Sequence, residues 1–345
     1  MVKKILVFNV GSSTLKFSLF EGKQKTIEGK YEKLNSDEKF KKAFNEISNE
    51  LEKKIGFDLI IHRVVHGGDI KKPVKINKKI KSKIKEFSKF APLHNPKQLT
   101  IINLAEKFKK PQYAVFDTMF FSKLPNISKL YPIPKELTKK YHIQRYGFHG
   151  LSHKSVSQGL KGKTITCHLG RGASMTAIEN SKPVDTSMGL TPLEGLMMCT
   201  RSGDIDPGLI IFLEKKGYNT KKILNLFSGI KGISKYSDFR DILKTMNKNK
   251  DSKLAYEMFA YHIIKYIGAY SAVLDGIDNL IFTGAIGENV PKLRKYICDR
   301  IDYLGVKLDK NKNKLLISSK KSKVKIYVKH TEEDQIMIKE VMKII

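Results

Sequence analysis

A strand, a glycine-containing turn and a second strand occur twice in this sequence, with Gly11 and Gly170 at corresponding positions 159 residues apart. The stretch Phe8-Asn9-Val10-Gly11-Ser12-Ser13 aligns with Cys167-His168-Leu169-Gly170-Arg171-Gly172, and an apolar or alternating segment follows each. The turns that end these second segments also match, with Glu21-Gly22-Lys23 over Asn180-Ser181-Lys182. Two such openings, one at the start of each half, predict a duplicated α/β fold with a cleft between two similar domains.

Periodicity and capping signals predict the other elements of each half. In the first half we expect a helix from about residue 37, strands at 58–62 and 113–116, and a helix that starts at Asn95-Pro96 with the asparagine as its cap. In the second half we expect helices at 207–216, 220–227 and 252–274, a strand at 279–282, a helix from about 291, strands near 315 and 324, and a last helix from 332. The helix at 252–274 is mostly apolar, which predicts burial between layers.

Composition indicates a globular chain of about two domains, because 41% of the 345 residues are hydrophobic. No apolar stretch has membrane-spanning length, and the start of the chain lacks the pattern of a signal peptide. The three cysteines are scattered and form neither a disulfide framework nor a CxxC metal pattern, which favours the cytoplasm. The formal net charge of +31 makes nucleic acid a rival partner. However, the excess is mostly lysine spread along the chain, so we expect no specific nucleic-acid binding.

Glycine-containing turns follow three predicted strands, at 11–14, 170–172 and 284–287. Free backbone N–H groups at such turns allow the phosphates of a nucleotide to approach closely. Each turn alone also fits a plain hairpin or bend, and no GxxxxGK[ST] loop is present. The three turns together favour a nucleotide site.

Charged and polar residues at strand ends or in glycine- or proline-marked turns form a second set: Arg63, His94, Asp117, His149 and Arg201. Each of them alone is more often a surface residue or a satisfied core residue. Two arginines, two histidines and an acid together favour phosphoryl transfer, because that reaction needs fixed positive charge on the transferring oxygens.

These features resemble those of the acetate kinases, in the acetate/propionate/butyrate kinase family of the sugar-kinase/Hsp70/actin superfamily. The segments that carry the resemblance run from residue 9 to 289, with a weaker match, HTEED, near residue 331: NVGSSTLKFSLF, HRVVHGG, APLHNP, VFDTMFF, RYGFHGLSH, DTSMGLTPLEGLMMCTRSGDIDPG, SDFRD and FTGAIGEN. The resemblance implies two duplicated actin-like, ribonuclease H-like domains with a nucleotide cleft between them. Residues 1–149 would form an N-terminal acyl- and phosphate-binding domain onto which a C-terminal helix at about 330–345 packs, and residues 150–329 a nucleotide-binding domain.

The resemblance also implies a reversible, direct in-line transfer between ATP and acetate, giving ADP and acetyl phosphate, with Mg²⁺ and no covalent nucleophile. Arg63 and Arg201 would clamp the carboxylate and the phosphoryl group, and His149 would stabilise the transition state, with His94 in support. Asp117 and Glu332 would help to place Mg²⁺ or the acyl group, with Asn9 as a further metal and phosphate contact. The implied nucleotide contacts are Asn9, Lys16, His168, Gly170, Arg171, Gly172, Asp238, Phe239, Arg240, Ala285, Ile286 and Asn289.

The resemblance also implies which acyl groups the site accepts. The residues that match the small apolar pocket of the family are Val65, Leu93, Phe148 and Pro192. One methylene group changes binding by only about 1–3 kcal/mol, so we expect a modest preference for acetate over propionate and no useful activity on butyrate. The alternatives are a propionate kinase of the same family and a non-catalytic nucleotide-binding relative. The family further implies a homodimer.

The sequence departs from the family pattern in several places. It looks short before Arg63 and between His149 and Cys167. Cys199 stands at a family glycine, Gly284-Ala285 replaces alanine-glycine, and Glu333 is a possible substitute for Glu332. The family motif HLGNG reads HLGRG here, so Arg171 replaces an asparagine. Arg171 either points outward or adds a positive charge over the β- or γ-phosphate.

Overall fold

The structure, a computed structural model, describes residues 3–34, 36–54, 56–309, 311–312 and 315–345. The chain divides into two compact units. Unit 1 comprises Met1–Ser122, Phe148–Leu151 and Glu332–Ile345, and unit 2 comprises Lys123–Gly147 and Ser152–Thr331.

Within the described residues, each unit is built on one mixed six-stranded sheet, with the strand orders β3-β2-β1-β4-β6-β5 and β9-β8-β7-β10-β12-β11. The strands of unit 1 are β1 (Lys4–Val10), β2 (Leu15–Glu21), β3 (Gln24–Tyr31), β4 (Leu59–Val64), β5 (Val74–Lys75) and β6 (Gln112–Phe116). Those of unit 2 are β7 (Lys163–Leu169), β8 (Ala173–Glu179), β9 (Lys182–Thr186), β10 (Asn279–Thr283), β11 (Leu315–Leu316) and β12 (Lys325–Val328).

The two sheets have the same topology, strand for strand. In each, the first three strands form an antiparallel meander, and two further strands run parallel to the first. The short strands β5 and β11 then pair antiparallel at the far edge. Since β1 and β7 begin at Lys4 and Lys163, they keep the spacing of 159 residues found in the sequence. The prediction of a duplicated α/β fold is confirmed.

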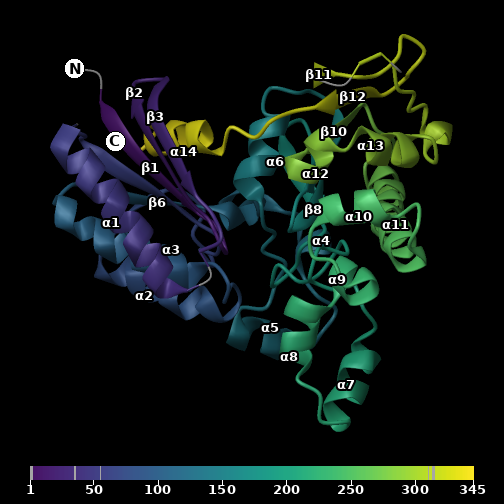
Figure 1. Cartoon of the computed structure of the whole chain (residues 1–345), viewed down its shortest axis with the longest axis horizontal. Helices are drawn as coiled ribbons and strands as arrows, with labels where there is room; N and C mark the ends of the chain where they lie inside the picture. The colour runs from purple at the N-terminus through teal and green to yellow at the C-terminus, as the bar shows by residue number, and fades with distance from the viewer. Residues whose placement is uncertain (1–2, 35, 55, 310, 313–314) are drawn as a thin grey trace. The chain divides into compact units, whose positions relative to one another are not determined.

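Unit 1 has helices on both faces of its sheet (Figure 1). Its longer helices are α1 (Asp37–Lys54), α2 (Lys78–Glu86), α3 (Asn95–Leu104) and α14 (Glu333–Val341). It also has short 3₁₀ turns at Phe87–Lys89 and Ala105–Phe108 and most of a longer one at Asp117–Lys123. The apolar residues of α1 recur at helical spacing, and Phe40, Phe44 and Ile47 are buried against the sheet together with Leu6 and Phe8.

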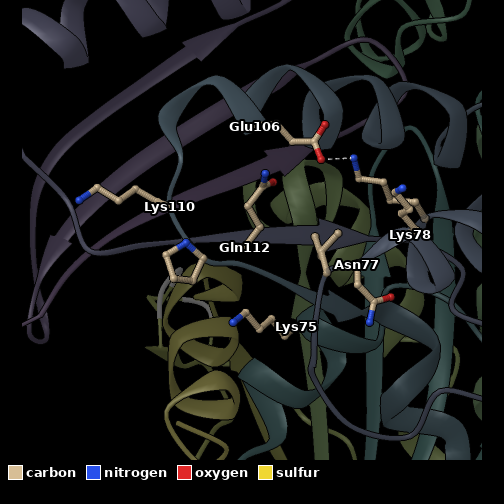
Figure 2. A pocket seen from close by; sticks show the side chains of 9 residues that line it. Lys75, Asn77, Lys78, Glu106, Lys110 and Gln112 are labelled. Carbon is tan, nitrogen blue, oxygen red and sulfur yellow. Dashed lines mark hydrogen bonds and ion pairs between the residues drawn. The ribbon is translucent and has the colours of Figure 1, made fainter.

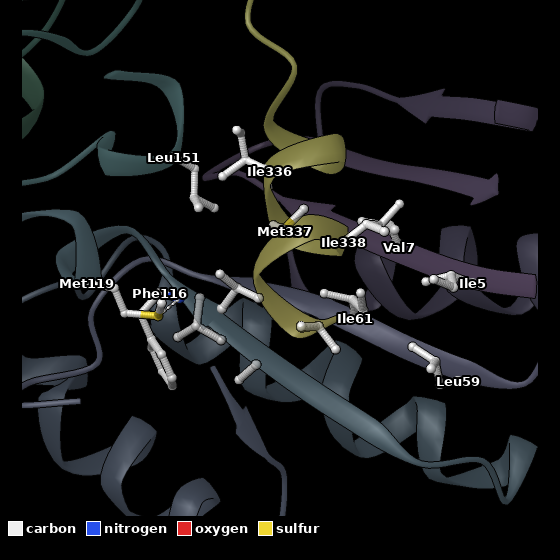
Figure 3. Packing of buried hydrophobic residues seen from close by; sticks show 14 of the residues in the cluster. Ile5, Val7, Leu59, Ile61, Phe116, Met119, Leu151, Ile336, Met337 and Ile338 are labelled. Atoms are coloured by element: carbon white, nitrogen blue, oxygen red, sulfur yellow. Dashed lines mark hydrogen bonds between the residues drawn. The ribbon is translucent and has the colours of Figure 1, made fainter. Parts of the chain in front are cut away.

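The C-terminal helix α14 packs on the other face of the same sheet (Figure 3). Ile336, Met337 and Ile338 contribute to a buried cluster with Val7 and Ile61. This packing brings the start of α14, with Glu333, to the sheet of unit 1 although most of unit 2 lies between them in the sequence.

Unit 2 has its longest helix, α11 (Lys250–Val273), packed against β7 and β8. Its other helical segments are α4 (Asn126–Lys129), α5 (Lys135–Tyr141), most of α6 (Gly150–Ser157), α7 (Pro207–Lys215), α8 (Thr220–Lys222), a π-helical turn (Ile223–Phe227), α9 (Gly229–Ser234), α10 (Phe239–Thr245), α12 (Gly284–Asn289), α13 (Pro291–Cys298) and a 3₁₀ turn (Asp302–Leu304).

Four details of the sequence prediction are wrong. Asn95 does not cap α3: His94 occupies the cap position, and Asn95 is the buried first residue of the helix. Residues 220–227 are a short α-helix followed by a π-helical turn. Residues 284–287 belong to the helix α12 and not to an open turn. The helix α11 buries one face only, because Leu254 and Tyr261 on its other face are exposed.

Candidate active site

Arg63 lies at the centre of a polar cluster at the carboxyl ends of β1, β4 and β6. Its guanidinium donates to Asp117 from both Nε (3.2 Å) and Nη2 (2.8 Å) and to Asn9 Oδ1 from Nη1 (3.1 Å). The same Nη1 pairs with Glu333 at 3.1 Å, and Asn9 Nδ2 donates to Glu333 Oε2 at 2.8 Å. The structure therefore joins the predicted residues Asn9, Arg63 and Asp117 with Glu333 of α14, which the sequence offered as the substitute for Glu332.

Burial makes the charges of this cluster interdependent. The side chain of Asp117 is 1% exposed and that of Arg63 is 13% exposed. Burial alone would lower the pKa of Arg63, but the carboxylates of Asp117 and Glu333 outweigh it and raise that pKa. Burial raises the pKa of Asp117, and Arg63 opposes this rise. Arg63 thus stays charged and is held in a fixed orientation.

Two buried amide side chains of α3 hold the ends of β1 and β4. Gln98 accepts a hydrogen bond from Val65 N (2.9 Å) and donates to Val10 O (2.8 Å). Asn95 accepts from His66 N (3.0 Å) and donates to His66 O (2.9 Å). The sequence analysis interpreted Asn95 only as a helix cap and did not name Gln98. Asn95 lies within the APLHNP segment and Gln98 lies two residues beyond it, and this position is the signal that could have suggested them.

The segment that carries His149 is packed against Asp117. Leu151 N lies 3.4 Å from Asp117 Oδ1 and donates to it. A Cβ atom on Gly150 would come within 2.0 Å of the main-chain oxygen of Asp117, so only glycine fits there. His149 precedes this glycine, has a positive φ of 55° and is partly exposed.

The predicted acyl-pocket residues of unit 1 lie near these strand ends. Val65 directly follows β4 and is buried, as is Phe148, whose ring contacts His66 edge-on at 5.5 Å between centroids. Leu93 and His94 are partly exposed in the turn before α3. Lys16 is exposed and pairs with Asn9 across β1 and β2, so both side chains project from the same face of the sheet.

In unit 2, Arg201 is held by the irregular segment 187–206. Its Nη1 donates to the main-chain oxygen of Pro192, which joins two predicted residues. Burial lowers the pKa of Arg201 to about 10, and the nearby positive charge of Arg171 acts in the same direction. The guanidinium therefore stays charged at neutral pH.

The turn 170–172 between β7 and β8 is closed by a hydrogen bond from Gly170 N to Gly172 O (3.0 Å). The Arg171 side chain is exposed, and its main-chain oxygen accepts from Cys199 N (3.2 Å). The Cys199 thiol faces Gly170 O at 3.9 Å. Two departures from the family pattern, Arg171 and Cys199, are therefore in direct contact.

His168 and the start of α12 are two further predicted parts of the nucleotide site, and both lie at the end of β7. His168 Nδ1 is 2.7 Å from Ser152 Oγ. Gly284, with φ of 78°, approaches Leu169 so closely that a Cβ atom would lie 2.7 Å from the Leu169 oxygen, which brings the start of α12 to the end of β7. In α12, Ala285 and Asn289 are exposed, whereas Ile286 is buried.

Asp238 caps α10 by accepting from Arg240 N at 2.9 Å, and its carboxylate also pairs with the Arg240 guanidinium at 2.6 Å. These hydrogen bonds, helped by the charge of Arg171, lower the pKa of Asp238 to about 2. Phe239, the first residue of α10, is buried, and its ring packs against the rings of Tyr256 and Phe259 in α11.

A cavity of about 490 Å³ lies elsewhere in unit 1, at the start of β6, whereas Asp117 follows the end of that strand (Figure 2). Lysine side chains line it, and Lys81 is paired with Glu106. This cavity contains none of the predicted site residues.

No helix among the described residues is long and apolar enough to cross a membrane. Likewise, the described residues contain no group of three or more His, Cys, Asp or Glu side chains arranged to hold a metal ion by themselves.

Comparison with known proteins assigns the family. Residues 28–339 match the model of the Acetokinase family. The chain is 40% identical to the acetate kinase of Carboxydothermus hydrogenoformans over 99% of both chains. That alignment spans 394 positions, more than the 345 residues here, so this chain lacks internal segments that the relative has.

Solved structures agree with this match. The acetate kinase of Porphyromonas gingivalis superposes with a TM-score of 0.87 at 35% identity over 99% of each chain. A propionate kinase from Francisella tularensis subsp. tularensis SCHU S4 gives a TM-score of 0.87 at 36% identity over 98% of each. The chain therefore belongs to the Acetokinase family.

Proposed function

We propose that this chain is a phosphotransferase that interconverts ATP and acetate with ADP and acetyl phosphate. The observation that carries the proposal is the cluster of Asn9, Arg63, Asp117 and Glu333 in a chain that matches acetate kinases along its whole length. A fixed guanidinium at a strand end can bind both a carboxylate and a phosphoryl group through paired N–H donors.

The two arginines have complementary surroundings in this proposal. Arg63 is held by carboxylates and can orient the substrate anion, whereas Arg201 is anchored by a neutral carbonyl and keeps its full charge for the transferring oxygens. His149 would donate a hydrogen bond to those oxygens in the transition state. Transfer is direct, since phosphoryl transfer depends on positioning and charge stabilisation and not on a protein nucleophile.

Mg²⁺ fits the donor chemistry of unit 1. Asn9, Asp117 and Glu333 offer oxygen atoms, which Mg²⁺ prefers, and kinase sites usually hold this ion through one or two carboxylates together with substrate phosphates and water. The contacts of Glu333 with Asn9 and Arg63 make it a second candidate beside Glu332 for this role. When bound, the ion would neutralise charge on the phosphates.

The nucleotide would bind to unit 2 and the acyl group mainly to unit 1. The turn at 170–172 and the start of α12 would face the phosphates, while Asp238 and Arg240 would lie at the adenosine side with Ala285 and Asn289. Phe239 and Ile286 would support these segments from the core, because both are buried.

We also propose that the chain is a cytoplasmic homodimer. Its three cysteines are buried and unpaired, which suits a reducing compartment. The helix α7 supports dimerisation, because none of its residues is buried although Leu209, Ile211 and Phe212 are large and apolar. Replacing Phe212 with glutamate should convert a dimer into a monomer in sedimentation analysis; an unchanged mass would contradict this surface.

The assay that tests the function supplies ATP, Mg²⁺ and one acid at a time, and traps the acyl phosphate with hydroxylamine. We expect the highest kcat/KM with acetate, a modestly lower value with propionate and negligible turnover of butyrate, because Val65 and Phe148 restrict the pocket. Equal kcat/KM with butyrate would contradict the pocket assignment. The similarity to a propionate kinase makes propionate the main competitor, and a preference for it would assign that activity instead.

A further inference from the structure

The segment 187–206 holds Arg201 and Pro192 but has no regular secondary structure. Since it gains no support from a helix or a strand ladder, other groups must fix its backbone. The hydrogen bond from Arg201 Nη1 to Pro192 O makes the orientation of the guanidinium depend on where residue 192 lies. What fixes residues 189–194 therefore also fixes Arg201.

Tyr131 and Glu194 fix that stretch of backbone. The Tyr131 hydroxyl accepts a hydrogen bond from Leu190 N at 2.9 Å and donates its own proton to Glu194 Oε2. The chain makes room for this contact at Gly189, where a Cβ atom would lie 1.7 Å from Glu194 Oε2 and 1.8 Å from the Tyr131 hydroxyl oxygen. Burial and the charge of Glu194 raise the pKa of Tyr131, so the hydroxyl remains protonated and able to donate.

Arg145 connects the same carboxylate to the rest of unit 2. Its Nη2 donates to Glu194 Oε1 at 2.7 Å, Nη1 donates to Thr186 O at 3.1 Å, and Nε donates to Ser128 O at 3.1 Å. Its guanidinium also lies over the Tyr131 ring, 5.4 Å from the centroid. Both oxygens of Glu194 are thus engaged, one by Tyr131 and the other by Arg145.

We propose that Tyr131, Arg145 and Glu194 are positioning residues that hold the 189–194 backbone, and through the Pro192 carbonyl the Arg201 guanidinium, in the geometry required for phosphoryl transfer. This inference rests on the function proposed above. The three residues do not act on the substrate themselves. A displacement of about 1 Å in a group that contacts the reacting atoms can lower a rate about 100-fold, so a modest shift of Pro192 is enough to affect turnover.

The variant Tyr131→Phe removes one hydroxyl group and keeps the ring over which Arg145 lies. It should lower kcat about 5- to 30-fold and leave the KM for ATP within about twofold, because the network acts on the transferring group. The matched control is Tyr146→Phe in the same unit, whose hydroxyl donates to the His142 oxygen at 2.9 Å. The control should keep its kcat within about twofold.

A double-mutant cycle with Arg201→Lys separates positioning from general support of the fold. If Tyr131 acts through Arg201, Tyr131→Phe should cause less than a twofold further loss of kcat in the Arg201→Lys background. Equal fold losses in both backgrounds would overturn the proposal, as would a wild-type kcat in Tyr131→Phe alone. Should Tyr131→Phe fail to fold, Glu194→Gln takes its place in the cycle, with the same outcomes.

The same assay distinguishes this inference from the proposed function. A wild-type chain that forms no acyl phosphate contradicts the function, and with it the inference. An active wild-type chain with an additive cycle contradicts the inference alone. If Arg201→Lys leaves no measurable rate, the single variants decide: a raised KM for ATP at unchanged kcat overturns the positioning role.

Discussion

The guanidinium of Arg63 and the carboxylate of Asp117 form a buried ion pair, with 2.8 Å between Nη2 and Oδ2. Arg63 comes from the end of β4, and Asp117 directly follows β6, the neighbouring parallel strand. The strand pairing of unit 1 therefore creates this pair, and Asn9 at the end of β1 completes it from the other side. A fixed cation at the carboxyl edge of a sheet is the element that phosphoryl transfer needs most.

Replacing Asp117 with asparagine should lower kcat about 100-fold. The amide keeps the size of the side chain but leaves Arg63 without its closest counter-charge, so the guanidinium loses its fixed orientation. We also expect a loss of about 1–3 kcal/mol in the free energy of unfolding, measured with urea. The exposed ion pair of Asp69 with Lys83 provides the control, since Asp69→Asn should change neither quantity measurably. Normal turnover by Asp117→Asn would contradict the role of this pair.

The variant Gly150→Ala should reduce both stability and activity. The new Cβ atom would meet the Asp117 main-chain oxygen at 2.0 Å, and backbone atoms cannot move aside cheaply, so we expect a loss of about 1–3 kcal/mol. Gly56→Ala in the same unit is the matched control, because no other described residue outside its two chain neighbours comes within 4 Å of the added Cβ atom. Equal melting temperatures of the two variants would show that the contact of 148–151 with Asp117 does not matter.

Arg171→Asn restores the residue expected from the family motif. It tests whether the Arg171 side chain adds positive charge at the phosphates or points outward without contacting them. The exposed guanidinium contributes positive charge near Asp238 and Arg201, so its removal should raise the KM for ATP about three- to tenfold and change kcat less. Arg300→Asn removes another exposed arginine of unit 2 and should leave this KM unchanged. An unchanged KM in Arg171→Asn would mean that the turn contacts phosphates only through its backbone.

The stability of unit 1 should fall in acid partly because of His62, which is buried and hydrogen-bonded to Gln112. Burial lowers the pKa of His62 to about 3, whereas the unfolded chain takes up this proton near the ordinary value of 6.5. The contribution of His62 to stability is therefore complete above pH 6.5 and is lost as the pH falls toward 3, by at most about 1.4 kcal/mol per pH unit.

Urea unfolding between pH 4 and 9 checks this expectation. His62→Asn should reduce the slope of the unfolding free energy against pH below 6.5 and leave the slope between pH 7 and 9 as in the wild type. Parallel curves across the whole range would contradict the assignment of acid sensitivity to His62.

The sequence predicted the duplicated sheets because the repeat of strand, glycine turn and strand is local, and its spacing of 159 residues survives in β1 and β7. It predicted that Arg63 and Asp117 belong to one site because both stand at the ends of predicted strands. Tertiary contacts decided what the sequence could not show. Asn95 looked like a helix cap, but its side chain is better satisfied by the main chain of His66.

Contacts between distant residues explain the other omissions. In the sequence, Gln98 is one polar residue of a predicted helix. Its role depends on the packing of that helix, which brings its amide to the main chain of Val10 and Val65 at the ends of β1 and β4. The role of Glu194 could not be predicted from the sequence, because its partners Tyr131 and Arg145 are far away along the chain. The choice between Glu332 and Glu333 depends on the phase of α14, and the structure directs Glu333 toward Asn9 and Arg63.

The most direct test of the central claim follows ATP, acetate and Mg²⁺ by ³¹P NMR with the wild-type chain and with Arg201→Ala. We predict an acetyl phosphate resonance that grows with ADP in the wild type, and loss of most of this rate in Arg201→Ala with unchanged thermal unfolding. The absence of acetyl phosphate in the wild type, or near-normal turnover by Arg201→Ala, would contradict the proposed phosphoryl transfer at this site.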